Sequence, residues 1–502
     1  MSDSTSLPRS NRESPINMSP ETFRQSGHKL IDELADFFES LPSRSVTNAP
    51  TVAQIRELLG DRPAPSEQSD PSELLRDVTQ QLLENSLFNG HPRFWGYVTS
   101  SATPIGALAD LLASTINQNV GAWQLSPMAS EIEIQVVRWI AEFVGYPSDC
   151  GGLMVSGGNM ANFIGFLAAR RAKVPWDVRE SGLQGNERRV RVYCSSATHT
   201  WMQSAADLFG LGIESIRWID CDLNERMDTK DLERKIIEDK QEGLIPIMVS
   251  ASCGTVGTGA VDPINAIADI CEAQDLWFHI DGAYGAMAAQ IPDASEEPMS
   301  LHRADSLALD PHKWLYSPLE AGCALVRNAE HLPDTFDYRP SYYKFDLEGE
   351  QPPTNFYGLG MQNSRGFRAL KVWLAFKQIG TDAFKKSIAQ DITLSRAMAE
   401  ALSSHPEIEV VTCQLSIVTF RFVPSQLDLS GEESESYLNK LNDALLEEIQ
   451  AGGEAYVSNA VLQGMFVLRA CIVNFRTTLE DVQMLPLLVA EIGNRLHAES
   501  AI

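Results

Sequence analysis

A lysine and an aspartate each follow an apolar segment of the chain, and together they could bind an aromatic ring that carries an aldehyde. Lys313 lies in Leu309-Asp310-Pro311-His312-Lys313-Trp314-Leu315, and Asp281 lies in His279-Ile280-Asp281-Gly282-Ala283-Tyr284. A lysine amine can hold an aldehyde as a Schiff base. A carboxylate can keep a ring nitrogen protonated, so that the ring accepts electrons from a breaking bond. The two residues therefore predict a pyridoxal phosphate site.

Each of these residues also has a plainer interpretation. Lys313 could be a surface lysine in a loop, yet leucine, proline, histidine and tryptophan surround it in sequence. An apolar setting removes water from the ammonium group and makes the amine more nucleophilic. Asp281 could cap a helix, yet the small residues Gly282 and Ala283 follow it and would let a flat ring lie against the backbone.

Three further segments carry residues suited to such a cofactor. The turn Ser156-Gly157-Gly158-Asn159-Met160-Ala161-Asn162 follows an apolar strand, so its backbone N–H groups could hold a phosphate; the alternative is an ordinary capping turn. His199 follows another strand and could stack on a ring, although a lone histidine is more often structural. Thr255, in a turn rich in glycine and threonine, could bond near Asp281 or to the cofactor.

The composition argues against several classes of protein. The chain has 502 residues, of which 44% are hydrophobic and 21% charged, enough for two or three globular domains. Its formal charge of -27 is spread along the chain, which argues against nucleic acid and anionic membranes as partners. The eight cysteines include no Cys-x-x-Cys pair, so we expect no disulfide framework, no zinc site and no other metal. Neither an apolar targeting region nor the roughly 20 apolar residues of a membrane span is present, so we expect a soluble, cytoplasmic protein.

The hydrophobic pattern divides the chain into four parts. We expect a disordered tail over residues 1–19, an N-terminal helical arm over 20–90, a large cofactor-binding domain over 91–385 and a small C-terminal domain over 386–502. In the large domain, short β-branched runs alternate with helical stretches, which predicts an α/β fold with a mostly parallel sheet. The small domain should be α+β. Catalytic groups gather beyond the carboxyl ends of such strands, where Ser156, Asp281 and Lys313 would lie.

Taken together, these segments resemble the pyridoxal phosphate-dependent group II amino acid decarboxylases, which include the aromatic-L-amino-acid and glutamate decarboxylases. The resemblance runs from about residue 20 to the C-terminus. Its markers are His91-Pro92-Arg93-Phe94, Ser126-Pro127, the Ser156–Asn162 turn, His199, the His279–Tyr284 block, Asp310–Trp314 and Val467-Leu468-Arg469. It implies a fold-type I pyridoxal phosphate-dependent carboxy-lyase with a mostly parallel seven-stranded sheet. It also implies a homodimer with the active site at the interface.

The resemblance assigns roles around the cofactor. Lys313 would hold it as a Schiff base, and Asp281 would pair with its ring nitrogen. His199 would stack on the ring, and Ala283 would pack beneath it. The residues around the phosphate would be Gly158, Asn159 and His312.

Two positions depart from the common pattern of this family. Asn159-Met160 stands where Ser-Glu is frequent, and Asp310 stands where asparagine often precedes Pro-His-Lys. Neither change removes an essential group. An anionic Asp310 would nevertheless be poorly placed if it faced the phosphate.

A mobile loop after the lysine strand carries a catalytic tyrosine in this family. Arg339-Pro340-Ser341-Tyr342-Tyr343 matches that position, so the resemblance makes Tyr342 the proton donor to the carbon that loses carbon dioxide. In related aldehyde-forming enzymes phenylalanine typically replaces this tyrosine, so Tyr342 favours amine formation. The adjacent Tyr343 leaves open which of the two rings acts.

The family pattern also predicts the substrate pocket. Its residues would be Trp95, Tyr97, Val98, Asn119 and Trp123 near the dimer interface, with Phe356 and Tyr357 after the mobile loop. An aromatic lining suits tryptophan, tyrosine, phenylalanine or dihydroxyphenylalanine, although each of these aromatic residues taken singly is better explained by core packing.

Several alternatives stay open. Pro318-Leu319-Glu320 resembles the branch that acts on glutamate, aspartate or cysteine sulfinate, and Arg93 or Arg339 could pair the distal carboxylate of such a substrate. A diamino acid is a less favoured substrate. Transamination or oxidative deamination to an aldehyde would use the same cofactor. The chain could also be a non-catalytic cofactor binder, although a scaffold has no chemical need for Lys313, Asp281 and Tyr342 together with His199.

Overall fold

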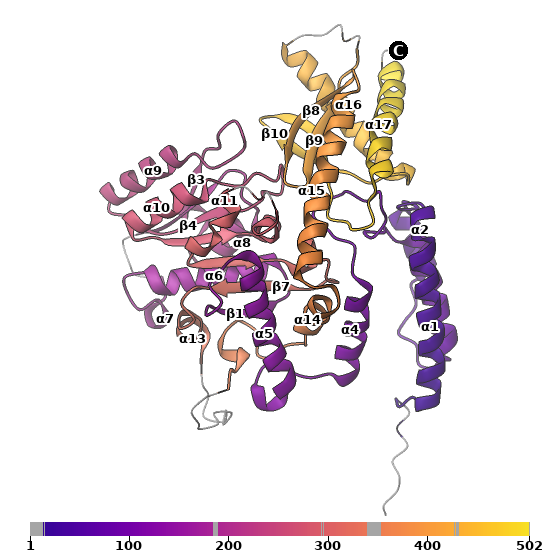
Figure 1. Cartoon of the computed structure of the whole chain (residues 1–502), viewed down its shortest axis with the longest axis horizontal. Coiled ribbons are helices and arrows are strands. Elements are labelled where there is room, and N and C mark those ends of the chain that lie inside the picture. Colours follow the sequence, from indigo (N-terminus) through magenta and orange to yellow (C-terminus); the bar gives the residue numbers. More distant parts are fainter. Residues whose placement is uncertain are drawn as a thin grey trace, which may run out of the picture. The chain divides into compact units, whose positions relative to one another are not determined.

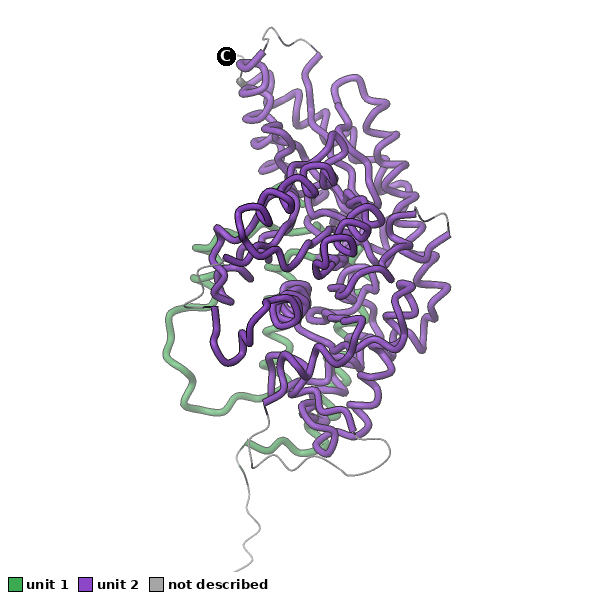
Figure 2. Tube along the Cα trace, turned by 90° about the vertical axis from the view of Figure 1, so that its left-hand side faces the viewer, with its two compact units in different colours: residues 1–88, 451–453 green, residues 89–450, 454–502 purple. Residues whose placement is uncertain are grey.

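The chain folds into two compact units, of which the first is the smaller. The computed structural model describes residues 14, 16–183, 189–292, 294, 296–338, 353–425, 427 and 431–500. The first unit comprises the chain up to Phe88 with Ala451–Gly453, and the second comprises Asn89–Gln450 and the chain from Glu454 onward (Figure 2). The tail predicted over residues 1–19 lies mostly outside the described residues, which omit 1–13 and 15.

The first unit is helical, and polar side chains begin its helices. The helices are α1 (Pro20–Ser40), the 3-10 helix η1 (Leu41–Ser43), α2 (Val52–Leu59) and α3 (Pro71–Asn85). Helices α1, α2 and α3 begin after Ser19, Thr51 and Asp70, whose side chains accept hydrogen bonds from backbone N–H groups of the first turn. Such caps satisfy donors that a helix leaves unpaired at its start. Within the helical arm predicted over residues 20–90, the first helix begins at Pro20 and ends at Ser40.

The second unit contains a seven-stranded sheet in the order β1-β7-β6-β5-β4-β2-β3 (Figure 1). Its strands are β1 (Gly151–Val155), β2 (Val190–Ser195), β3 (Ile216–Ile219), β4 (Ile245–Ser252), β5 (Trp277–Asp281), β6 (Ser306–Leu309) and β7 (Gly322–Val326). Only β7 runs antiparallel to its neighbours, β1 and β6. This confirms the predicted α/β fold with a mostly parallel seven-stranded sheet.

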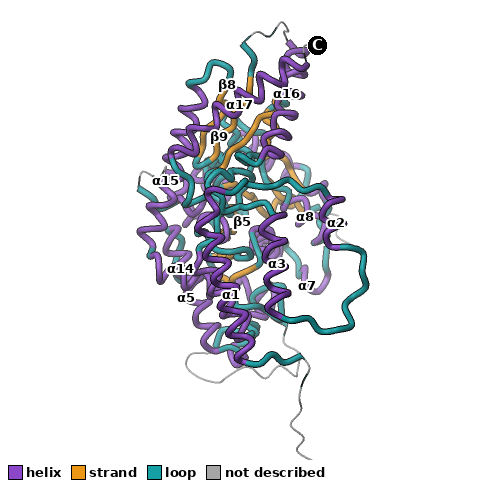
Figure 3. The backbone as a smooth tube through the Cα atoms, turned by 90° about the vertical axis from the view of Figure 1, so that its right-hand side faces the viewer, coloured by secondary structure: helices purple, strands orange, loops and turns teal. Residues whose placement is uncertain are grey.

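Helices cover both faces of this sheet because successive side chains of a strand point to opposite sides. In β5, Phe278 and Ile280 belong to one buried cluster and Trp277 to another. The first cluster includes side chains of α5 (Pro127–Val144), α9 (Thr229–Gln241), α10 (Ile264–Gln274) and α14 (Ala369–Ile379). The second includes side chains of α6 (Gly158–Lys173), α8 (Trp201–Leu208) and α13 (His331–Phe336). Strands thus lie between helices (Figure 3).

The second unit also contains the helices α4 (Pro104–Ile116), α7 (Val178–Ser181), α11 (Glu296–Met299) and α12 (Pro311–Trp314). Six 3-10 helices occur in the described ranges. Besides η1 they are η2 (Trp123–Leu125), η3 (Ile213–Ser215), η4 (Gly285–Ala288), η5 (Leu301–Arg303) and η6 (Phe356–Gly358). Across the described part of the chain, no helix combines the length and the apolar character that crossing a membrane requires.

A second, antiparallel sheet lies in the C-terminal part of the chain. Its strands follow the order β10-β11-β9-β8 and span Ser458–Leu462, Met465–Cys471, Ile417–Phe422 and Ile408–Gln414 respectively. Side chains of α15 (Thr381–Ser403), α16 (Gly431–Gly452) and α17 (Leu479–Ser500) build its core. The sheet and its helices agree with the expected smaller α+β region. The domain boundary at residue 386 stays a prediction.

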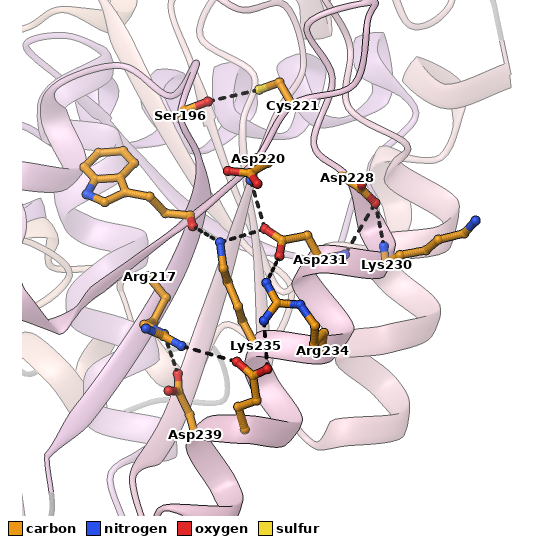
Figure 4. Close-up of polar contacts among 12 residues, drawn as sticks. Ser196, Arg217, Asp220, Cys221, Asp228, Lys230, Asp231, Arg234, Lys235 and Asp239 are labelled. Carbon is orange, nitrogen blue, oxygen red and sulfur yellow. Dashed lines mark hydrogen bonds and ion pairs between the residues drawn. The ribbon is translucent and has the colours of Figure 1, made fainter.

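Ion pairs and hydrogen bonds hold edge strand β3 against α9 (Figure 4). Lys235 Nζ donates to the carbonyl oxygen of Trp218 and to Oδ2 of Asp231, over 2.7 Å in each case. The same oxygen of Asp231 accepts the backbone N–H of Asp220 over 3.0 Å. These contacts fix the chain just after β3, where Asp220 and Cys221 line a cavity.

Candidate active site

All the residues predicted to contact the cofactor meet in one cavity at the carboxyl ends of the parallel strands. This lysine cavity has a volume of about 570 Å³. Its lining includes Lys313, Asp281, His199, Ala283, Gly158, Asn159, Thr255 and His312, together with Tyr97 and Val98 of the predicted substrate pocket. These predicted cofactor contacts lie on the segments at and after the ends of β1, β2, β4, β5 and β6, because parallel strands bring their carboxyl ends to one edge of the sheet.

Lys313 lies on the single turn of helix α12, directly after strand β6 and residue Asp310. Its Nζ lies 3.2 Å from Oδ2 of Asp310. The next residue, Trp314, is fully buried, and its ring stacks on that of Tyr284 with 4.7 Å between the ring centroids. This packing holds the backbone of α12 in place, so the amine of Lys313 is presented to the cavity from a fixed segment.

Asp281 ends strand β5, and its Oδ1 accepts a hydrogen bond of 3.2 Å from the backbone N–H of Ala283. Burial raises the pKa of Asp281 above its ordinary value, while the nearby charges of Lys313 and His199 act in the opposite direction. A further cationic group beside this carboxyl would favour its ionised form. The protonated ring nitrogen of pyridoxal phosphate is such a group, so the site suits the predicted pairing.

The turn before α6 leaves backbone donors available to an anion. Gly157 occupies the N-cap position, and no side chain caps the helix there. A Cβ atom on Gly158 would lie 2.7 Å from Oδ2 of Asp310 and 3.1 Å from Cβ of Ala283, so only glycine fits at this position. An uncapped helix start is a ready phosphate site. With the amine of Lys313 and the carboxyl of Asp281 on the same cavity, the donor set fits pyridoxal phosphate.

His312 is held in a defined orientation beside the lysine. Its Nδ1 accepts the backbone N–H of Ala321 over 3.2 Å, so the neutral ring carries its proton on Nε2. Nε2 lies 3.7 Å from Oδ2 of Asp310. Burial lowers the pKa of His312, with Asp310 acting against this shift. The imidazole therefore adds a donor to this part of the cavity and little positive charge near neutral pH.

His199 and Thr255 line the cavity, and each uses a polar atom within its own turn. Nδ1 of His199 accepts the backbone N–H of Trp201 over 3.1 Å. Oγ1 of Thr255 accepts the backbone N–H of Ala260 over 3.1 Å and lies 3.0 Å from Oγ1 of Thr258. The hydroxyl of Thr255 is therefore engaged mainly in shaping the turn after β4.

His279 is a buried residue of β5 for which the sequence analysis predicts no individual role. Its two ring nitrogens contact Oγ of Ser306 at 2.7 Å and Oδ1 of Asn162 at 2.8 Å. Burial lowers the pKa of His279 to about 3, so the ring is neutral. It joins β5 and β6 to α6 behind the cavity. The sequence signal for this residue was its position two residues before Asp281 on the same strand.

Five of the predicted substrate-pocket residues do not line the lysine cavity. Trp95 is fully buried in the core of the small sheet and donates its indole N–H to Oγ1 of Thr477 over 3.3 Å. The amide oxygen of Asn119 accepts backbone N–H groups of Gly121 and Arg365. Thus Trp95 is a core residue, and Asn119 shapes its own loop within the described chain.

Trp123, Phe356 and Tyr357 gather at a different place. The backbone N–H of Trp123 donates to Oδ1 of Asn355 over 3.1 Å, and that of Tyr357 donates to the carbonyl of Gly121 over 2.9 Å. Phe356 and Tyr357 line another cavity, of about 770 Å³. Trp123, predicted near the dimer interface, therefore lies with the two aromatic residues predicted after the mobile loop, and none of the three lines the cavity of Lys313.

Arg469 is a candidate functional residue that the sequence identified only as a family marker. It is 2% exposed, and its Nη1 donates to the carbonyl of Tyr97 over 2.9 Å and to Oγ of Ser458 over 3.2 Å. Its Nε and Nη2 are buried and have no hydrogen-bond partner among the described residues. An arginine within the apolar strand Met465–Cys471 was the signal that could have revealed it.

Arg469 lines a second cavity, of about 790 Å³, which adjoins the lysine cavity. Tyr97, Thr255 and Val256 line both cavities. The arginine side chain that carries two unpaired N–H groups is therefore close to the place where Lys313 presents its amine.

Other predicted residues are engaged elsewhere or lie outside the described ranges. Arg93, a candidate partner for a distal carboxylate, pairs with Asp481 at 3.0 Å and lines neither of these two cavities. Arg339, Tyr342 and Tyr343 are outside the described residues. Within the described ranges, no group of three or more His, Cys, Asp or Glu side chains is arranged to hold a metal ion.

Comparison with known proteins assigns the family. The pyridoxal-dependent decarboxylase conserved domain matches residues 54–423. An aromatic-L-amino-acid decarboxylase of Bacillus atrophaeus is 36% identical over 93% of this chain and 94% of its own length. Tyrosine decarboxylase 3 of Petroselinum crispum is 30% identical over 93% of this chain and 91% of its own length. The crystal structure of Oryza sativa TDC with PLP and tryptamine superimposes with a TM-score of 0.88 at 25% identity, covering 97% of this chain and 100% of that chain. The chain therefore belongs to the pyridoxal-dependent decarboxylases, carboxy-lyases that act on amino acids with pyridoxal phosphate as cofactor.

Proposed function

We propose that this chain converts an aromatic L-amino acid to its amine and carbon dioxide. The observation that carries this proposal is the buried guanidinium of Arg469, which keeps two unpaired N–H groups beside the lysine cavity. A planar guanidinium pairs well with a carboxylate. An amino acid could therefore place its carboxylate at Arg469 while its amine reaches the lysine cavity.

An aromatic side chain is the better choice over an acidic one. Among the described residues that line the two cavities, the only Lys and Arg side chains are those of Lys313 and Arg469. If Arg469 takes the α-carboxylate, a second carboxylate would lack a cation among the described residues, because Arg93 already pairs with Asp481. The names of the Bacillus atrophaeus and Petroselinum crispum relatives point to aromatic substrates.

The site residues have the following proposed roles. Lys313 holds the cofactor, Asp281 pairs with its ring nitrogen, and His199 stacks on the ring. Ala283 packs beneath the ring. Residues near the phosphate are Gly158, Asn159 and His312, with Thr255 shaping the wall.

The reaction needs an electron acceptor, a fixed carboxylate and a proton donor. When bound, pyridoxal phosphate takes up the electrons that remain as carbon dioxide leaves. Arg469 holds the carboxylate in place, and Asp281 in its ionised form keeps positive charge on the ring nitrogen. Tyr342 gives the proton to the α-carbon, which makes the product an amine.

A homodimer that shares its active sites is part of this proposal. Helix α4 leaves four large apolar side chains 46–55% exposed: Leu108, Leu111, Leu112 and Ile116. This helix starts against the segment after Lys313, since a Cβ on Gly106 would lie 2.3 Å from Cδ of Pro318. A second subunit that covered α4 could also bring Phe356 and Tyr357 to the lysine cavity, which their own chain does not do.

Two further expectations join the proposal. All eight cysteines are unpaired, which supports a reducing location such as the cytoplasm. We also propose the boundaries of the helical arm, large domain and small domain near residues 90 and 385. Limited proteolysis would test the boundaries.

The direct test is product analysis by mass spectrometry after purified, cofactor-loaded protein is incubated with aromatic, acidic and basic amino acids. We expect an amine from an aromatic member of the panel. An amine from glutamate, aspartate or cysteine sulfinate would instead assign the chain to the acidic branch. An aldehyde would indicate oxidative deamination, and no product with bound cofactor would indicate a binder.

A further inference from the structure

The carboxyl group of Asp310 lies between the reactive lysine and the phosphate turn. The residue is 2% exposed, and its Oδ2 lies 3.2 Å from Nζ of Lys313. A Cβ atom added to Gly158 would lie 2.7 Å from Oδ2 of Asp310. A Cβ atom added to Gly157 would lie 3.9 Å from Oδ1 of Asp310. The carboxyl group therefore faces the first residues of α6, where a phosphate would bind.

One oxygen of this carboxyl group is unsatisfied. Oδ1 of Asp310 is buried and has no hydrogen-bond partner among the described residues. A buried oxygen without a partner carries a cost that a ligand can remove. Because Oδ1 faces the same turn as the uncapped start of α6, the partner it lacks would come from whatever binds there.

Lys313 supplies the positive charge that favours an ionised Asp310. The titratable groups around Asp310 come from four segments: Lys313 and His312 on α12, Asp281 on β5, Cys323 on β7, and Glu320 in the loop before β7. Of these, Lys313 is the only lysine or arginine, and burial lowers the pKa of His312, which disfavours the charged form of that ring. Burial also keeps the thiol of Cys323 neutral, since it raises the pKa of that group.

Cofactor binding removes this positive charge and adds negative charge beside Asp310. To attack an aldehyde, the ammonium of Lys313 must give up one proton, and Oδ2 of Asp310 is within 3.2 Å of it. The two remaining hydrogens of the nitrogen leave with the aldehyde oxygen as water when the carbon–nitrogen double bond forms. At the same time a phosphate anion occupies the turn. Two adjacent anions in a buried site repel strongly.

We propose that Asp310 is protonated when the phosphate of the cofactor occupies the Gly157–Gly158 turn, and that its carboxyl O–H then donates a hydrogen bond to the phosphate. The proton comes from Nζ of Lys313. This protonation converts a repulsive contact into an attractive one, and it makes the contribution of the phosphate to binding weaker at high pH. The inference concerns cofactor binding and holds whichever amino acid is the substrate.

The test compares pyridoxal phosphate with pyridoxal, which lacks the phosphate. The ratio of the two dissociation constants isolates the phosphate, because Lys313 reacts with the aldehyde of both ligands. It is measured by absorbance titration in phosphate-free buffer between about pH 7 and about pH 9. We define the ratio as the dissociation constant of pyridoxal divided by that of pyridoxal phosphate. In the wild type we expect this ratio to fall by up to about tenfold for each unit by which the pH rises.

In Asp310→Asn the ratio of the two dissociation constants should not fall as the pH rises. At about pH 9 the ratio should therefore be larger in this variant than in the wild type. Glu320→Gln is the matched control, because Glu320 lines the same cavity but already pairs with Arg368 at 2.7 Å. It should keep the slope of the wild type. Parallel profiles for the wild type and Asp310→Asn would overturn the proposal.

A second measurement covers the case in which Asp310→Asn does not fold. In the infrared difference spectrum of the wild-type protein, a band of a protonated carboxyl group should appear on addition of pyridoxal phosphate and not of pyridoxal. Asp310→Ser, which is also neutral, should lack this band while still binding pyridoxal. Absence of the band in wild-type protein that binds the cofactor would contradict the inference. A protein that shows the band yet decarboxylates nothing would refute the proposed function alone.

Discussion

The indole N–H of Trp314 donates a hydrogen bond of 2.9 Å to Oδ2 of Asp391, a carboxyl group buried on α15. The hydroxyl of Tyr316 donates to the same oxygen over 2.8 Å. Trp314 directly follows Lys313, so Asp391 ties α15 to the segment that carries the reactive amine. Burial raises the pKa of Asp391 to about 7, against the effect of these two hydrogen bonds.

Asp391 should make the stability of the protein depend on pH. A carboxyl group whose pKa is higher in the folded than in the unfolded chain stabilises the folded state at low pH. This stabilisation is lost as the pH rises through the pKa of the group in the folded state. Between about pH 4 and about pH 7, the free energy of unfolding of the wild type should fall by roughly 1 kcal/mol per pH unit relative to Asp391→Asn. Urea unfolding of both proteins across this range measures the difference. The same pH dependence in both would show that Asp391 is not protonated near neutral pH.

Lys313→Ala should abolish covalent attachment of the cofactor. Reduction with borohydride fixes a Schiff base to its lysine, so the reduced wild type should gain the mass of the cofactor and the variant should not. Lys230→Ala, at an exposed lysine of helix α9, is the control and should behave like the wild type. Attachment of the cofactor in Lys313→Ala would assign the Schiff base to another lysine.

Tyr342→Phe should lower the yield of amine and raise that of aldehyde, because a phenyl ring has no proton to give to the α-carbon. The loss of a general acid typically costs about 10²- to 10⁴-fold in rate. Both products are quantified by mass spectrometry from the same incubation. Tyr343→Phe decides between the neighbouring rings: if that variant, and not Tyr342→Phe, loses amine formation, the proton donor is Tyr343.

Arg469→Met should weaken substrate binding and leave cofactor binding in place. Removal of one partner of a buried charge pair costs about 2–5 kcal/mol, so we expect kcat/KM to fall by about 30-fold or more. Arg421→Met is the matched control, because Arg421 is a buried arginine of the same sheet that pairs with Glu409 and Glu435. A fall in kcat/KM of equal size in both variants would mean that Arg469 acts through the stability of the sheet.

Glutamate substitutions at Leu108 and Leu112 on α4 should separate the subunits, because a buried unpaired charge strongly opposes association. Light scattering after size-exclusion chromatography would then give the mass of one chain, and the activity should fall with it. Leu208→Glu, at an exposed leucine of α8, is the control and should leave the mass of a dimer. A fully active monomer would refute the shared active site.

The sequence by itself determined the cofactor and the α/β fold class, and the residues that it predicts as cofactor contacts all line one cavity. These features depend on local patterns. A strand ends in Asp281, and a glycine turn follows another strand. Lys313 lies in an apolar run, and parallel strands bring their carboxyl ends to one edge of a sheet whatever the distance between them in sequence.

Only the tertiary structure decided which aromatic residues lie near the lysine. Trp95 and Tyr97 are two residues apart, yet the first is fully buried in the small-sheet core and the second is 56% exposed and lines the cavity. Residues two apart in an extended segment point to the same side, but Tyr97 has a left-handed backbone conformation with a φ of 53°, so this rule does not hold for the pair. Likewise, the orientation of Asp310 toward the phosphate turn and the unpaired nitrogens of Arg469 depend on contacts between distant segments. Burial and hydrogen bonding at such contacts are set by packing in three dimensions, which no local pattern encodes.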